Sequence, residues 1–129
     1  MAGMSPTQRT LRALREQGRI CAIVERFNHH VGEFGIRQDL FGFIDIIALD
    51  PDRGAVAIQS FGQDWSGHVK KLLGERNEAV FEWLKHHPCE LWGWRKVKLK
   101  RGGRATRWAP RVGDVVLLDD DHLEIRERK

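Results

Sequence analysis

The feature that most constrains this sequence is a pair of apolar runs separated by a short turn. The runs are residues 43–49 (FIDIIAL) and 55–61 (AVAIQSF), and the turn is residues 50–54 (DPDRG). Nearly continuous apolar runs of this length are typical of strands buried on both faces of a sheet. The Pro- and Gly-containing turn favours an antiparallel hairpin, and a register in which Leu49 faces Ala55 also places Asp45 opposite Gln59.

Asp45 is an acid inside the first apolar run, where an ionised carboxylate needs a partner or a metal ion. Facing positions on antiparallel strands hold their Cβ atoms about 4.5–5.5 Å apart, so oxygens of Asp45 and Gln59 are expected to converge. Mg²⁺ is bound by one or two carboxylates together with carbonyl oxygens and water. A simpler alternative stays open, in which Gln59 donates a hydrogen bond to Asp45 and the pair is only structural.

The surrounding elements predict one α/β domain over residues 1–129, with a mixed central β-sheet flanked by helices. Ser5, Pro6 and Gln8 are typical of a helix start, and Gly18 of the residue that follows a helix. The other expected elements are a strand over 19–27, a long irregular loop reaching Asp39, helices over 67–73 and 77–87, a basic hairpin over about 90–111, a short strand over 114–118 and a C-terminal tail over 119–129.

Composition excludes several classes of protein. No stretch approaches the roughly 20 apolar residues of a membrane span, so no membrane association is expected. The two cysteines, Cys21 and Cys89, and the absence of an apolar leader favour a reducing, cytoplasmic location. No phosphate-cradling glycine loop, nucleophile motif or four-ligand zinc spacing is present.

A basic segment between Arg95 and Arg111 contains no acid. Its charges interleave with tryptophans, which favours a surface that follows nucleic-acid phosphates, with DNA as the expected partner. The alternative is an ordinary solvated hairpin. The expected DNA-binding residues are Arg95, Lys96, Lys98, Lys100, Arg101, Arg104, Arg107, Trp92, Trp94 and Trp108.

The order of helix, strand, glycine-containing loop, Asp strand and hairpin partner resembles the PD-(D/E)XK nuclease superfamily, which has the restriction-endonuclease-like fold. Residues 37–45 (RQDLFGFID) are similar to the same segment of small, phage-type Holliday-junction resolvase-like proteins, and the likeness covers about residues 5–98. In that family the first helix offers an acid, the second strand an Asp and the third strand a Glu-x-Lys. The matching positions here are Gln8, Asp45, Gln59 and Phe61.

The resemblance implies an endonuclease that depends on Mg²⁺ or Mn²⁺, with Asp45, Gln59 and Asp39 as metal ligands. Gln8 joins Asp45 and Gln59 in the implied catalytic set, and Lys70 or Lys71 replaces the missing motif lysine, with His68 as a proton carrier. Neighbouring helical positions point about 100° apart, so only one of these lysines can face the hairpin, and the sequence does not choose between them.

Three functions therefore stay open. The first is a metal-dependent DNA endonuclease selective for branched DNA. The second, favoured by the two glutamines, is a nuclease-fold module that binds nucleic acid without cutting it. The third is a protein-interaction or inhibitor module with exposed tryptophans. The resemblance also implies a homodimer, because a junction offers two symmetric cuts.

Overall fold

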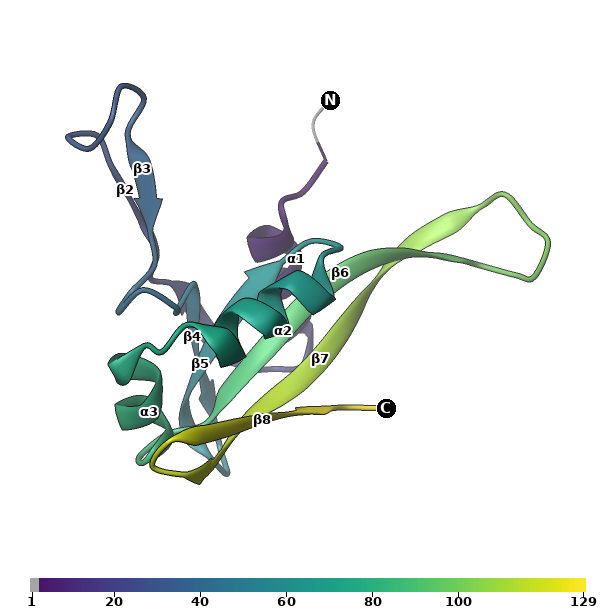
Figure 1. Cartoon of the computed structure of the whole chain (residues 1–129). Helices are drawn as coiled ribbons and strands as arrows, with labels where there is room; N and C mark the ends of the chain where they lie inside the picture. The colour runs from purple at the N-terminus through teal and green to yellow at the C-terminus, as the bar shows by residue number, and fades with distance from the viewer. Residues whose placement is uncertain (1–2) are drawn as a thin grey trace.

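The computed structural model describes residues 3–129 as a single α/β domain with helices packed on both faces of a mixed sheet (Figure 1). Six strands form the main sheet in the order β1-β4-β5-β6-β7-β8, and two more form a separate small sheet. The predicted α/β class and mixed sheet are confirmed. The elements are α1 (Pro6–Glu16), β1 (Ile20–Ile23), β2 (Arg26–Asn28), β3 (Ile36–Gln38), β4 (Ile46–Asp50), β5 (Gly54–Phe61), α2 (Trp65–Gly74), α3 (Glu78–Leu84), β6 (Cys89–Lys98), β7 (Thr106–Asp119) and β8 (His122–Glu127).

The β4–β5 hairpin has the predicted register, with Leu49 facing Ala55. Its turn is closed by Asp50, whose carboxylate accepts hydrogen bonds from the backbone N–H groups of Asp52 and Arg53. Gly54 completes the turn at φ 79°, a conformation that glycine adopts at little cost. The predicted pairing of Asp45 with Gln59 does not extend this ladder. The N–H of Asp45 donates instead, at 2.9 Å, to the carbonyl of Ile58, the residue that already pairs with Ile46, so the register shifts by one before β4 as in a β-bulge.

The sheet is mixed because β5 and β6 run parallel, and α2 and α3 form the crossover between them. Alternate residues of the central strands fill two cores. One lies under α1 and includes Leu14, Ile58 and Trp92, and the other lies under α2 and α3 and includes Phe61 and Trp65. Burial on both faces is why these strands are almost continuously apolar.

The strand expected over residues 19–27 is divided in two. The N–H groups of Val24 and Glu25 both point to the carbonyl of Asp45, at 2.9 and 3.4 Å, and end the regular ladder there. The chain then leaves the main sheet, and β2 pairs with β3 instead. The expected irregular loop to Asp39 is therefore a second hairpin, which projects from the body of the domain (Figure 1).

The C-terminal half also differs from expectation. The strands expected on either side of residue 112 form one strand, β7, and the expected tail contains β8. β8 alternates charged residues with Leu123 and Ile125, which pack against the core below α2. Two apolar residues are a weak strand pattern, and for this reason β8 was not predicted. The expected helices are present as α2 and α3, with Asp64 and Asn77 as their N-caps. Within residues 3–129 no helix is long and apolar enough to cross a membrane.

A buried glutamate joins four distant parts of the chain. The side chain of Glu90 on β6 is inaccessible to solvent and accepts hydrogen bonds from the indole N–H of Trp92 and from Arg19, Arg53 and Arg128. Burial alone would raise the pKa of Glu90, but these donors outweigh it and lower the pKa to about 2. The glutamate thereby ties β6 to the start of β1, to the β4–β5 turn and to the C-terminal end.

We expect Glu90→Gln to lower the free energy of unfolding by roughly 3 kcal/mol, because it leaves several guanidinium groups facing a neutral amide. The wild-type stabilisation from this group is complete above the ordinary pKa of 4.5 and disappears as the pH falls towards 2. Urea unfolding between pH 2 and 6 measures both effects. Equal stability of wild type and variant above pH 5 would contradict the assignment.

Candidate metal centre

Three carboxylates meet beside the β4–β5 hairpin. Oxygen atoms of Glu25, Asp39 and Asp45 all lie within 4.8 Å of one another. Glu25 occupies the break between β1 and β2, Asp39 follows β3 directly, and Asp45 directly precedes β4. The cluster therefore lies at the base of the β2–β3 hairpin, and two of its three members are the residues that flank that hairpin.

Asp45 is fixed by both its backbone and its side chain. The N–H of Ser60 donates to Asp45 Oδ2 at 2.7 Å, and the carbonyl of Asp45 accepts the N–H of Val24. A tight turn precedes it, with Phe41 at φ 55° and Gly42 at φ 80°. Positive φ is uncommon for a phenylalanine, and this strained turn brings Asp39 back beside Asp45.

Burial strongly raises the pKa of Asp45, and the neighbouring Asp39 carboxyl raises it further. The hydrogen bond from the Ser60 N–H opposes these effects, and the resulting pKa is about 9. Without a cation, Asp45 therefore holds a proton at neutral pH. Carboxylates bind cations in their ionised form, so a bound divalent ion would displace this proton.

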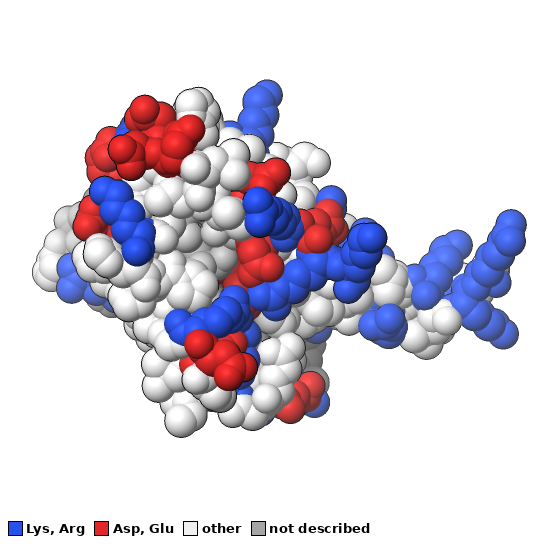
Figure 2. Space-filling view, turned by 90° about the horizontal axis from the view of Figure 1, so that it is seen from below, with Lys and Arg blue, Asp and Glu red and all other residues white. Residues whose placement is uncertain are grey.

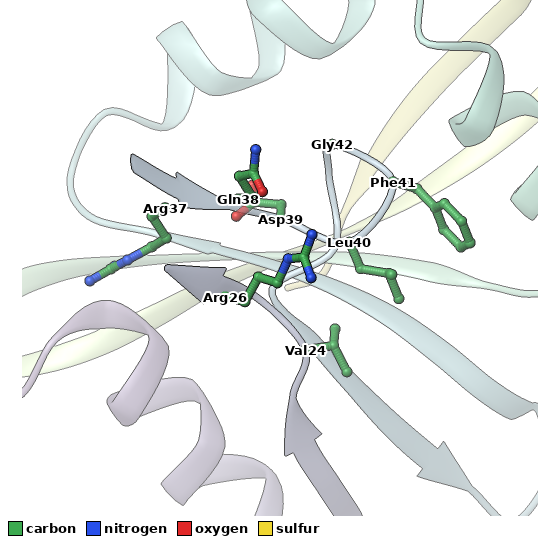
Figure 3. A pocket seen from close by; sticks show the side chains of 8 residues that line it. All are labelled: Val24, Arg26, Arg37, Gln38, Asp39, Leu40, Phe41 and Gly42. Atoms are coloured by element: carbon green, nitrogen blue, oxygen red, sulfur yellow. The ribbon is translucent and has the colours of Figure 1, made fainter. Parts of the chain in front are cut away.

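The cluster borders a cavity of about 240 Å³, which is also lined by Thr7, Gln59 and His68. Two larger hollows adjoin it, and Asp39 lines all three. One, of about 630 Å³, lies against the β2–β3 hairpin, where Arg26 and Arg37 extend in different directions from the strands (Figure 3). The other, of about 540 Å³, is lined by Lys71 on α2. Cationic side chains thus flank the acidic cluster on two sides.

The structure brings most of the predicted site residues together. Asp45 and Gln59 line one cavity, and Asp39 joins them. The hydrogen bond to the Asp45 carboxyl comes from the Ser60 backbone, rather than from the Gln59 amide that the structural alternative required. Of the two candidate lysines, both exposed, Lys71 lines the neighbouring hollow and Lys70 does not.

One predicted site residue lies elsewhere, and one member of the cluster was not predicted. The side chain of Gln8 is exposed on another surface, beside Met4 and Arg12, and it is Thr7 that faces the cavity. The Gln8 N–H donates to the Ser5 hydroxyl at 3.1 Å, as expected for a helix cap. Glu25 was missed because it fell within an expected continuous strand. Its charge at the end of the apolar run 20–24 was the available signal.

His68 on α2 has a defined tautomer. Its Nδ1 lies 2.8 Å from the carbonyl oxygen of Asp64, and because a carbonyl only accepts hydrogen bonds, Nδ1 carries the proton. The ring stacks on Phe61 with centroids 4.2 Å apart, which fixes its orientation. In the neutral ring, Nε2 is therefore the nitrogen that can accept a proton at the cavity.

The tryptophans of the basic hairpin differ from expectation. Trp92 and Trp94 are 2% and 7% exposed, and their indole N–H groups donate to Glu90 and Thr10. Trp108 is half-buried, and the cationic groups of Arg9 and Lys96 lie 4.4 and 5.4 Å from its ring centre. Trp92 and Trp94 therefore belong to the core, which removes them from the expected DNA surface and from the expected exposed tryptophans of an interaction module.

Comparisons of the chain with protein-family models, with curated proteins and with solved structures found no match. The geometry and charges of the acidic cluster are therefore the basis for assigning a function.

The raised pKa of Asp45 predicts a loss of stability in the metal-free protein as the pH rises from about 4 towards 9. The folded state keeps the Asp45 proton over this range, whereas the unfolded chain releases it near the ordinary pKa of 3.8. Asp45→Asn has no such proton, so its unfolding free energy should fall less with pH. Urea unfolding in EDTA at pH 5, 7 and 9 measures the difference, and parallel profiles would contradict the raised pKa.

Proposed function

We propose that this chain is a metal-dependent DNA endonuclease of the PD-(D/E)XK type, acting on branched or distorted DNA. The observation that carries the proposal is the cluster of Glu25, Asp39 and Asp45, in which Asp45 is buried and the other two carboxylates are half-buried. The guanidinium of Arg37 lies 3.7 Å from Glu25 and compensates part of this charge. The remaining carboxylates repel one another unless protons or a bound cation compensate them. Carboxylate oxygens are the ligands that Mg²⁺ and Mn²⁺ prefer.

The arrangement of elements supports the same fold family. α1, β1, β4 and β5 follow one another in the order on which the resemblance rests, with a glycine-containing hairpin between β1 and β4. Asp45 directly precedes β4, the strand that corresponds to the family's Asp strand, and Gln59 lies on its hairpin partner β5. Glu25 supplies a carboxylate where Gln8 and Gln59 offer only neutral amides.

A divalent cation held by the three carboxylates would activate water and stabilise charge on the scissile phosphate. The chain's own residues have distinct parts around it. His68 Nε2 is placed to accept the proton of the attacking water, and Lys71 and Arg37 offer positive charge to a phosphate on either side of the cluster. The amide oxygen of Gln59 orients water within the cavity.

A second candidate is a nuclease-fold module that binds DNA without cutting it. Its support is Phe61, which is buried and stacks on His68 where the family has its lysine. Any catalytic lysine must therefore come from α2. The proton held by Asp45 at neutral pH also weakens cation binding, because the cation must displace it.

Asp45→Asn should reduce metal-dependent cleavage by orders of magnitude, because each 1.36 kcal/mol lost from transition-state stabilisation costs a factor of ten. The fold should persist, since the asparagine oxygen still accepts the Ser60 N–H. The assay uses labelled duplex, single-stranded and four-way-junction DNA with Mg²⁺, Mn²⁺ or EDTA. Asp52→Asn makes the same chemical change in the exposed turn and is the matched control.

Equal cleavage by wild type and Asp45→Asn would reject this site. A wild-type protein that binds DNA but cuts none of the three substrates with either metal would establish the second candidate.

Glu25→Gln should reduce the rise in melting temperature that Mn²⁺ produces, because the variant removes one of the three charges that hold the cation. Glu33→Gln, on the exposed loop of the same β2–β3 hairpin, is the matched control and should respond to Mn²⁺ as wild type does. Thermal unfolding with and without Mn²⁺ measures the shift. The same Mn²⁺ response in both variants would remove Glu25 from the ligand set.

A further inference from the structure

A long basic ribbon projects from the sheet. β6 and β7 continue beyond the other strands as a two-stranded hairpin, here called the arm, which comprises residues 95–109 (Figure 1). The arm contains no acid, and its cationic residues are all exposed. They are Arg95, Lys96, Lys98, Lys100, Arg101, Arg104 and Arg107.

These charges have no acidic partner. No salt bridge within residues 3–129 involves any of them. Elsewhere on the surface, arginines such as Arg76 and Arg111 lie against carboxylates. Figure 2 shows the outer end of the arm with only Lys, Arg and uncharged residues. Such concentrated, uncompensated charge attracts a polyanion.

The arm is attached to α1 through Trp108. The cationic groups of Arg9 on α1 and Lys96 on β6 both lie against the ring of Trp108, which is half-buried. The remaining arm residues include no aromatic side chain, and Leu99 is the arm's large exposed apolar residue. Proteins that hold single strands rely on exposed aromatic rings for base stacking, and the arm lacks such rings.

Cations lie on both faces of the ribbon. Lys96 faces Trp108 and Lys98 faces Thr106 across the two strands, so these lysines share the face that continues into the α1 core. Arg107 faces Val97 and lies on the opposite face. A ribbon with this arrangement can meet phosphates on both sides of a groove.

We propose that the arm binds double-stranded DNA by entering its major groove. The major groove of B-form DNA is about 12 Å wide and admits a two-stranded β-ribbon. The major groove of duplex RNA is too narrow for side chains to read, which favours DNA. This inference deepens the proposed function, since it assigns the contact with duplex flanks to the arm. α1 joins the two sites, with Arg9 at the arm and Thr7 at the acidic cavity.

The test measures binding of labelled duplex DNA by fluorescence anisotropy in EDTA, so that cleavage plays no part. The variant Lys96→Ala/Lys98→Ala/Lys100→Ala should bind at least tenfold more weakly at low salt. The slope of log affinity against log salt should fall by about 3, since each lost phosphate contact removes roughly 0.9. The control Lys85→Ala/Arg126→Ala/Lys129→Ala removes the same charge from other surfaces and should stay within about twofold of wild type.

Several outcomes would overturn the inference. They are unchanged affinity of the arm variant, an equal loss in the control, or wild-type binding of single-stranded DNA or duplex RNA as tightly as duplex DNA. Binding of phosphatidylserine vesicles that depends on the arm, without DNA binding, would assign the arm to membranes. Circular dichroism melting should show that both triple variants fold as wild type does.

Cleavage is separable from this result. A protein that binds through the arm but never cuts would support the arm and reject the nuclease proposal. A protein that cuts DNA while its arm variant binds duplex DNA normally would support the nuclease proposal and reject the role of the arm.

Discussion

The register between β4 and β5 determines the position of almost everything else in this domain. It sets Asp45 beside the backbone of Ser60, and it aligns β5 so that α2 and α3 can cross over to a parallel β6. A slip of one residue would exchange the faces of both strands, moving Ile46 and Ile58 from the core under α1 to the core under α2 and α3 and disrupting the packing of both. The turn at Asp50 and Gly54 prevents that slip through local hydrogen bonds and a positive φ.

This local control explains why the hairpin could be predicted from the sequence. The turn residues are contiguous, and the apolar pattern on either side has an unambiguous length. The same is true of α1, where Ser5 and Pro6 specify the start. β8 and the β2–β3 hairpin were not predictable in this way, because short strands with few apolar residues depend on neighbours that are distant in sequence. Glu25 was missed for this reason: its role depends on a break in β1 that the Asp45 carbonyl creates.

The tryptophans show a related limit. A run in which tryptophan and cation alternate has the same sequence pattern whether the aromatic side chains face solvent or core. The even-numbered positions of β6 pass from beneath α1 onto the arm, so Trp92 and Trp94 are buried, while Lys96 and Lys98 on the same face emerge into solvent. The change from buried to exposed side chains on β6 occurs where the strand extends beyond α1. The alternating residues of β6 do not reveal where α1 stops covering the strand.

Glu25 and Asp39 lie at the two ends of the β2–β3 hairpin, so a movement of the hairpin would also move these two carboxylates. Its outer part carries exposed apolar side chains, including Phe34, which is 84% exposed, while its base holds two of the three carboxylates. A molecule that fixes the outer hairpin also fixes the spacing of these two groups relative to Asp45. Thermodynamic linkage makes such an effect reciprocal, so the factor by which a molecule on the hairpin changes the cation affinity of the cluster is also the factor by which the cation changes that molecule's affinity.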